Sequence, residues 1–377
     1  MHGIELLAPQ YAVAWYPWAV QYFFLIALSY GALWLALPGV VLGRARWMPT
    51  ARLALLAAAS TALVAPVTLL ADLHQPLRAW HFYAHPTPSS WMSIGSIVLP
   101  LHVAAVLALA WLVWRAPLAG AARRAGVAGR LARLVRAGDW DGPRWLVPVV
   151  GGLAVAVSLP VALYTGAEVA VIRARPLWHT EYLPVMLVAT GIVGAAGLVV
   201  VLNRATGLRD RITDAQMLAV IAGALVLAGL VAVGWLAQGL AMSRGGSVAT
   251  ALEAVRADPH WRALALWGLA AGAGLFAAAA GLRVAGRDMG WLSGLILGLV
   301  ALHVAWMFRW TVLMEVQTVA RNSAGAQDYV LALGSQGLLG IIGSFGLWLA
   351  VVLIVNLFIP WRAALPVPHP TGDTRHG

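Results

Sequence analysis

The chain of 377 residues contains no cysteine and no lysine. Without cysteine it forms no disulfide, and it holds neither a cysteine-ligated iron–sulfur cluster nor a thiolate zinc site. Charge is scarce as well: charged residues make up 10% of the chain, whereas soluble domains carry about 25%. Hydrophobic residues reach 61%. This composition excludes a soluble globule and predicts a membrane protein with several spans.

Long apolar runs follow one another along the chain. A helix needs about 20 mostly apolar residues to cross a bilayer. No run alternates apolar and polar residues with a period of two, so we expect helices and not the strands of a barrel. The fold class predicted is therefore all-α, with nine transmembrane helices. The runs cover residues 17–41, 53–71, 92–114, 145–170, 182–202, 214–241, 261–282, 291–314 and 335–359.

Arginine is distributed unevenly between the two sides of the predicted membrane. The loops on one side and the C-terminal tail carry 17 arginines, those on the other side carry 7, and Arg309 lies inside the eighth run. By the positive-inside rule we expect the N-terminus outside and the C-terminus in the cytoplasm. The net charge of +11 thus reflects topology and lipid contact, and we expect no nucleic-acid partner. Within the arginine-rich loop 116–143 we expect an amphipathic helix on the membrane surface.

A polar stretch follows the second run, on the arginine-poor side. An ionisable group at the edge of a bilayer is costly to keep, which makes it a candidate for a functional site. A carboxylate or a histidine there can accept a proton. The alternative is structural: Asp72 caps a helix end and the tryptophans belong to the interfacial belt. The stretch offers Asp72, His74, Arg78, Trp80, His81, His85 and Trp91.

Two further groups of polar residues lie in or next to spans on that side. Tyr164 lies near the end of the fourth run, and Glu168 follows one helical turn later. Glu168 is either a proton relay or a partner for Arg173 or Arg175. Early in the first run, Gln21 is an uncommon polar residue beside Tyr22. A hydrogen bond between helices is the alternative role for such an amide.

The order of these motifs resembles the NrfD/PsrC family of quinone-binding membrane subunits of molybdopterin oxidoreductases. The residues that carry the resemblance are Asp72-Leu73-His74-Gln75-Pro76, Arg78-Ala79-Trp80-His81, Pro88-Ser89-Ser90-Trp91-Met92-Ser93 and Tyr164-Thr165-Gly166. Pro17–Phe24 and the ninth run are most similar to the tetrathionate reductase branch. In the family the tyrosine of the Tyr-x-Gly motif lies at the quinone, which implies that role for Tyr164. Polar groups early in the first helix line the quinone pocket, and Gln21 matches them best by position.

The resemblance implies a pair of four-helix bundles with an extra helix. Residues 1–202 would form the bundle with the quinone site, 203–359 the second bundle, and 360–377 a disordered cytoplasmic tail. The chain would be a quinol-reactive anchor for a ferredoxin-like four-cluster iron–sulfur subunit and a molybdopterin catalytic subunit. Its membrane would be a bacterial inner membrane, with the N-terminus in the periplasm. The expected catalytic residues are Asp72, His81 and Glu168, and those expected at the quinone are Gln21, Tyr22, Arg78, Trp80 and Tyr164.

Two other functions compete with this interpretation. A di-haem cytochrome b anchor needs paired axial histidines at facing depths, and only His102 and His303 lie clearly within runs. A proton-coupled transporter would use Glu168, His303 and Arg309 as coupling residues. The eighth run also carries Glu315 near its end. We expect its polar residues to form a structural network in preference to a proton route, away from the quinone pocket of runs one, two and four.

Overall fold

The computed structural model describes residues 13–139, 142–143, 145–241, 246–319 and 329–363. In these ranges, nine helices are long and apolar enough to cross a membrane. Each coincides with one predicted run, so the prediction of an all-α protein with nine spans is confirmed. The spans are α1 (Pro17–Val40), α2 (Met48–Asp72), α4 (Trp91–Ala122), α6 (Leu146–Ala170), α7 (Tyr182–Ala205), α8 (Arg211–Ala241), α10 (Pro259–Val284), α11 (Trp291–Leu313) and α12 (Leu338–Phe358). Three shorter α-helices, α3 (His81–Ala84), α5 (Val127–Arg136) and α9 (Ser247–Ala257), lie in the connections.

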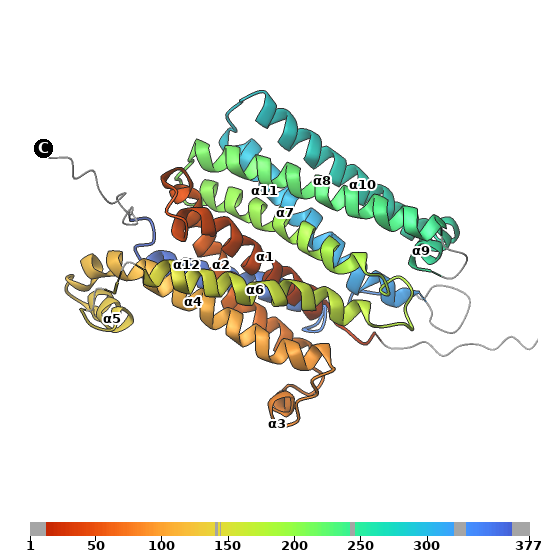
Figure 1. Cartoon of the computed structure of the whole chain (residues 1–377), viewed down its shortest axis with the longest axis horizontal. Helices are drawn as coiled ribbons and strands as arrows, with labels where there is room; N and C mark the ends of the chain where they lie inside the picture. The colour runs from red at the N-terminus through yellow and green to blue at the C-terminus, as the bar shows by residue number, and fades with distance from the viewer. Residues whose placement is uncertain (1–12, 140–141, 144, 242–245, 320–328, 364–377) are drawn as a thin grey trace, which may run out of the picture.

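The first helix, α1, is the centre of the molecule (Figure 1). It contacts α2, α6, α7, α11 and α12, and 20 of its 24 residues are buried. A helix that is apolar on every side is expected in such a position. By contrast, α10 buries only Trp261, Leu275 and Ala279. The apolar side chains that the outer helices expose match the lipid that surrounds a membrane protein.

Small residues allow α1, α7 and α11 to approach one another closely. A Cβ added to Gly31 in α1 would lie 2.8 Å from the Cβ of Ala195 in α7. Between α7 and α11, a Cβ added to Gly197 would lie 2.8 Å from the carbonyl oxygen of Gly298. Helices in lipid associate through close packing of this kind, because lipid tails are as apolar as the helix side chains and the hydrophobic effect therefore contributes little to helix association.

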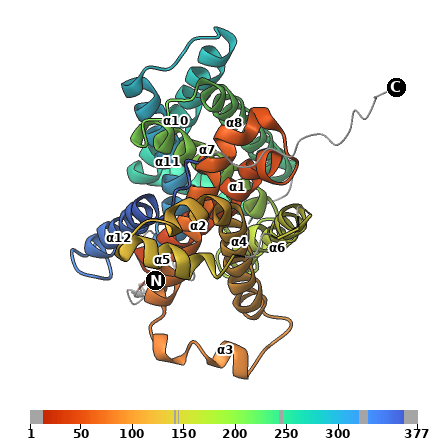
Figure 2. The ribbon, with the colours of Figure 1, turned by 90° about the vertical axis from the view of Figure 1, so that its left-hand side faces the viewer.

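The spans fall into two neighbouring groups. One contains α1, α2, α4 and α6; the other contains α7, α8, α10 and α11; and α12 packs on α1 and α2 (Figures 1 and 2). Since α7 contacts α1 as well as α8 and α11, the domain boundary after residue 202 stays a prediction. Of the predicted tail, residues 364–377 lie outside the described residues. Trp361, which precedes them, is 1% exposed.

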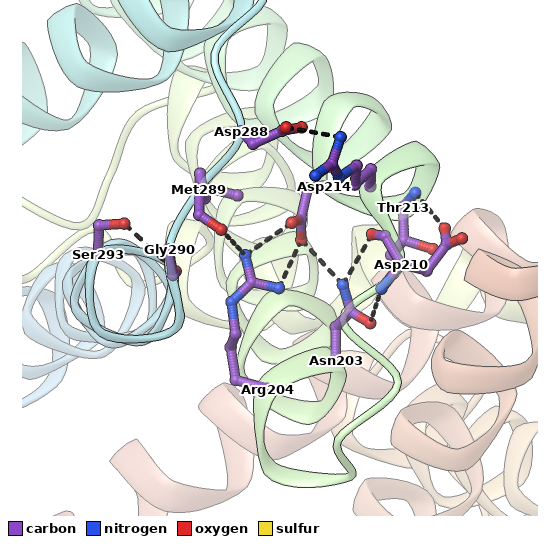
Figure 3. A network of polar contacts seen from close by, with 10 residues as sticks. Asn203, Arg204, Asp210, Thr213, Asp214, Asp288, Met289, Gly290 and Ser293 are labelled. Atoms are coloured by element: carbon purple, nitrogen blue, oxygen red, sulfur yellow. Dashed lines mark hydrogen bonds and ion pairs between the residues drawn. The ribbon is translucent and has the colours of Figure 1, made fainter.

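A buried ion pair joins α7 to α8 at the arginine-rich end (Figure 3). Arg204 donates to both carboxylate oxygens of Asp214, at 3.0 and 2.6 Å. Asn203 donates to the same carboxylate at 2.9 Å, and its own side-chain oxygen accepts from the Asp210 backbone at 2.9 Å. Removing one member of a buried ion pair typically costs about 3–5 kcal/mol, because the other charge is left uncompensated. This network therefore fixes the turn between the two helices.

Candidate functional site

Two tyrosines meet where α1 packs against α6. The hydroxyl groups of Tyr22 in α1 and Tyr164 in α6 are hydrogen-bonded to each other. Tyr22 is 0% exposed and Tyr164 is 3% exposed. Two phenols carry two O–H protons, and their mutual bond uses one of them. One proton of the pair therefore remains available to a third oxygen atom.

Two glycines make room for Tyr164. Gly95 in α4 lies against its ring, so closely that an added Cβ would overlap the ring atoms. Gly166, two residues after Tyr164, lies against Pro184 near the start of α7, where a Cβ would overlap the proline backbone. The Tyr-x-Gly spacing thus has a packing cause. It puts the tyrosine, which lies against α4, and the close contact with α7 on nearly opposite faces of α6.

Glu168 lies one turn beyond Tyr164 on α6 and is partly buried. Its carboxyl group interacts electrostatically with both Tyr22 and Tyr164. Among the described residues it forms no hydrogen bond and no ion pair. Among the described residues it therefore pairs with neither Arg173 nor Arg175, the alternative considered above, and Arg175 donates to the carbonyl oxygen of Val316 at 2.9 Å. A phenol pair with a spare proton and an uncommitted carboxyl group can together donate and accept protons.

Asp72 lies at the end of α2 and caps the first helix. Its Oδ1 accepts from the backbone N–H of Tyr16 at 2.9 Å, immediately before α1 begins at Pro17. A negative charge is stabilising at the N-terminus of a helix. The capping role considered for Asp72 is therefore present, although α1 and not its own helix receives the cap. Tyr22 is six residues further along, a rise of about 9 Å.

The loop between α2 and α4 carries Arg78, Trp80 and His81, and all three are exposed. Trp80 is 58% exposed, and its ring packs edge-on against His81 with centroids 4.0 Å apart. The loop, which includes α3, projects away from the spans (Figures 1 and 2). The structure does not bring these three residues to the tyrosine pair, and their part in quinone binding stays a prediction.

Gln21 is fully buried and faces other helices. Its Oε1 accepts from the indole N–H of Trp306 in α11 at 2.5 Å, and its Nε2 donates to Ser344 in α12 at 2.5 Å. The amide thus forms the hydrogen bonds between helices that were its alternative role. Tyr22, its neighbour, binds across to α6 instead, so the structure separates these two predicted ligands.

The polar residues Arg309, Glu315 and His303 of the eighth span lie in three separate environments. Arg309 is 1% exposed, and it donates to the carbonyl oxygens of Phe23 and Leu187, each at 2.9 Å. This buried guanidinium is held by neutral acceptors and joins α11 to α1 and α7. The sequence did not predict this link between helices. Glu315 accepts from Trp310 at 2.7 Å and pairs with His260 at 3.0 Å.

His303 faces an apolar groove of about 530 Å³ between α10 and α11. Its Nε2 accepts from the indole N–H of Trp267 at 3.0 Å. His102 in α4 is fully buried and bonds to Ser29 in α1 at 3.0 Å. These histidines have different partners and do not form an axial pair. Nor do Glu168, His303 and Arg309 share one site of the kind that a transporter would use for coupling.

Comparisons with known proteins identify the family of the chain. The family model described as "Polysulphide reductase, NrfD" matches residues 6–320. The chain is also similar to a tetrathionate reductase subunit of Salmonella typhimurium strain LT2, with 35% identity over 357 residues. The alignment covers 93% of this chain and 94% of that relative. The chain is thus a multi-pass membrane protein that belongs to the NrfD family.

Proposed function

We propose that this chain is the membrane subunit of a sulfur-compound reductase and that it exchanges electrons with the quinone pool at Tyr22, Tyr164 and Glu168. The observation that carries the proposal is the buried tyrosine pair near the Glu168 carboxyl group, which has no hydrogen-bond or ion-pair partner in the part of the chain that the structure describes. Buried polar groups in a span are expensive and mark functional sites. The similarity to a subunit of tetrathionate reductase supports the class of complex.

The residues of this chain would position the quinone and handle its protons. A quinol releases two electrons and two protons when it is oxidised. The spare O–H of the tyrosine pair donates to a quinone oxygen and so orients the head group. Glu168 accepts a proton as the quinol is oxidised, since a carboxylate within reach of the reacting hydroxyl is a general base. Asp72, nearer the start of α1, is the next acceptor toward the arginine-poor face.

Electrons must leave the chain through a partner, because a chain without cysteine has no thiolate ligand for an iron–sulfur cluster. We place that partner, a ferredoxin-like four-cluster subunit that leads to a molybdopterin subunit, on the arginine-poor face. The loops 72–91 and 168–182 lie there, on the side where α6 ends a few residues after Tyr164 and Glu168. Exposed apolar side chains such as Leu77, at 90% exposure, and Tyr83, at 61%, are available for docking.

Substitutions at the tyrosine pair test the proposal in the assembled complex. We expect Tyr164→Phe to lower the rate of quinol oxidation by up to about tenfold, because one hydrogen bond to a substrate is worth roughly 0.5–1.5 kcal/mol. Glu168→Gln removes a proton acceptor and should lower the rate further. Turnover of a soluble quinol analogue measures both effects.

Tyr30→Phe is the matched control. Tyr30 is another buried tyrosine of α1, but it interacts with Arg309 and not with Tyr164. Its substitution should leave the Michaelis constant for quinol unchanged. Wild-type turnover in both Tyr164→Phe and Glu168→Gln would refute the site.

A further inference from the structure

The short helix α5 exposes an apolar stripe. Its exposed apolar residues are Val127 (70%), Leu131 (38%), Leu134 (75%) and Val135 (43%). Spacings of four, three and one residue place them on one face of a helix. Ala132, a buried residue of α5 outside this stripe, packs inward against Leu118 and Ala122 of α4. The stripe is therefore not the surface by which α5 attaches to the rest of the protein.

Side chains from α4 fix the depth of α5 along the bundle. Trp111 donates its indole N–H to the carbonyl oxygen of Val135 at 2.7 Å. Arg115 donates to the carbonyl oxygens of Arg136 and Gly138, the latter at 3.1 Å. The C-terminal end of α5 is thereby held beside the last third of α4 (Figure 1).

That depth corresponds to the edge of the bilayer. Trp111 comes 20 residues after Trp91, the first residue of α4, so the two are about 30 Å apart along the helix. The hydrocarbon core of a bilayer is about 30 Å thick. With Trp91 at one edge, Trp111 lies at the other, where tryptophan is enriched. The stripe of α5 is thus at the level where lipid head groups meet acyl chains.

The charge around α5 matches anionic lipid. From Arg115 to Arg136 the chain carries six arginines and no acidic residue. Arg123, Arg124 and Arg130 are exposed, and their side chains form no hydrogen bond with the described residues. Lipid phosphates are the acceptors present at this depth, and arginine binds phosphate through two parallel N–H donors.

We propose that α5 is an interfacial helix that buries its apolar stripe in the leaflet at the arginine-rich end and binds anionic phospholipid head groups through Arg123, Arg124 and Arg130. Helices with an apolar face and arginines beside it lie in the membrane surface in this way. The bond from Arg133 to the carbonyl oxygen of Ala122, at 2.7 Å, would then keep α5 folded back along α4. A lipid contact of this kind is independent of the quinone site.

Spin labels test the buried stripe directly, since the chain has no cysteine of its own. Single cysteines at Val127 and Leu134 are labelled in the full chain, reconstituted in vesicles that contain phosphatidylglycerol. Ala125→Cys, exposed just before α5, is the control. We expect labels at 127 and 134 to collide more with oxygen than with a water-soluble nickel complex, and the label at 125 to show the reverse. More collisions with nickel at 127 and 134 would overturn the proposal, and so would protection from both reagents, which would indicate a protein partner.

The lipid preference needs a second measurement. Melting temperatures are compared in vesicles of phosphatidylcholine alone and in vesicles with one third phosphatidylglycerol. We expect the anionic lipid to raise the melting temperature of the wild type, and the Arg123→Gln/Arg124→Gln/Arg130→Gln variant to lose most of that increase. The same variant in phosphatidylcholine should melt like the wild type, which shows that it is folded. An equal increase in both proteins would refute the assignment of the three arginines.

Discussion

Tyr164 depends on the residue opposite its ring as much as on its own hydroxyl. Gly95 in α4 leaves the space that the ring fills, and no other residue type fits there without moving the ring. The sequence pointed to Tyr164 and Tyr22 separately, because each is a polar aromatic group at the edge of a span. Their contact could not be predicted, since it depends on how α1 and α6 pack. Nothing in the local pattern around Gly95 distinguishes it from other glycines in the spans.

We predict that Gly95→Ala lowers quinol turnover while the protein still folds. The added methyl group displaces the Tyr164 ring, and overpacking of this kind costs about 1–3 kcal/mol. Gly120→Ala is the matched control, because Gly120 lies in the same helix and a Cβ there would contact nothing within 4 Å. Steady-state kinetics and melting curves of both variants measure the effect. Equal turnover in the two variants would contradict the role given to the ring position.

At the scale of helices, polar side chains join elements that are distant in sequence. Gln21 links α1 to α11 and α12, and Arg309 links α11 to α1 and α7. The sequence predicted the nine spans because apolar length is a local property. It did not predict these links, because a polar residue in a span finds its partner only after the helices have packed. The same reason applies to Arg78, Trp80 and His81, which are close in sequence to Asp72 but lie on a projecting loop.

The hydrogen bond from the Tyr16 backbone N–H, at the start of α1, to the Asp72 carboxylate, at the end of α2, gives a prediction for Asp72. Asn can still accept the Tyr16 N–H bond, whereas Ala cannot. We therefore expect Asp72→Asn to keep the melting temperature of the wild type and to lower quinol turnover, since it removes a proton acceptor. Asp72→Ala should lower both, with about 1 kcal/mol lost from the missing cap.

Melting curves and turnover of the two variants separate these effects. If Asp72→Asn turned over quinol like the wild type, Asp72 would be a helix cap alone. The proton route would then have to begin at Glu168 without it.

For the whole molecule, the distribution of arginine predicts the orientation in the membrane. The projecting loop with α3 and the arginine-rich segment before α5 lie at opposite ends of the bundle (Figure 1). We predict that the first is periplasmic and the second cytoplasmic, because loops with many arginines stay inside. The number of spans follows from the nine apolar runs of the sequence. The grouping of α7 with α8 and α11 does not follow from span length, because it depends on glycine contacts.

Single cysteines measure this orientation without background labelling, since the chain has none of its own. Ala84→Cys, exposed at the end of α3, should react with a membrane-impermeant maleimide in intact cells. Ala125→Cys, exposed before α5, should react only after the cells are opened. The opposite pattern would place the quinone site and its partner on the cytoplasmic side.

The most direct test of the central claim is to locate bound quinone by photochemical labelling. The purified complex is illuminated with an azido-quinone, with and without an excess of unlabelled quinone, and the labelled peptides are identified by mass spectrometry. We predict labelling of peptides that contain Tyr22 in α1 or Tyr164 in α6, removed by the competitor. Competitor-sensitive labelling confined to α10 and α11, around the groove beside His303, would contradict the account.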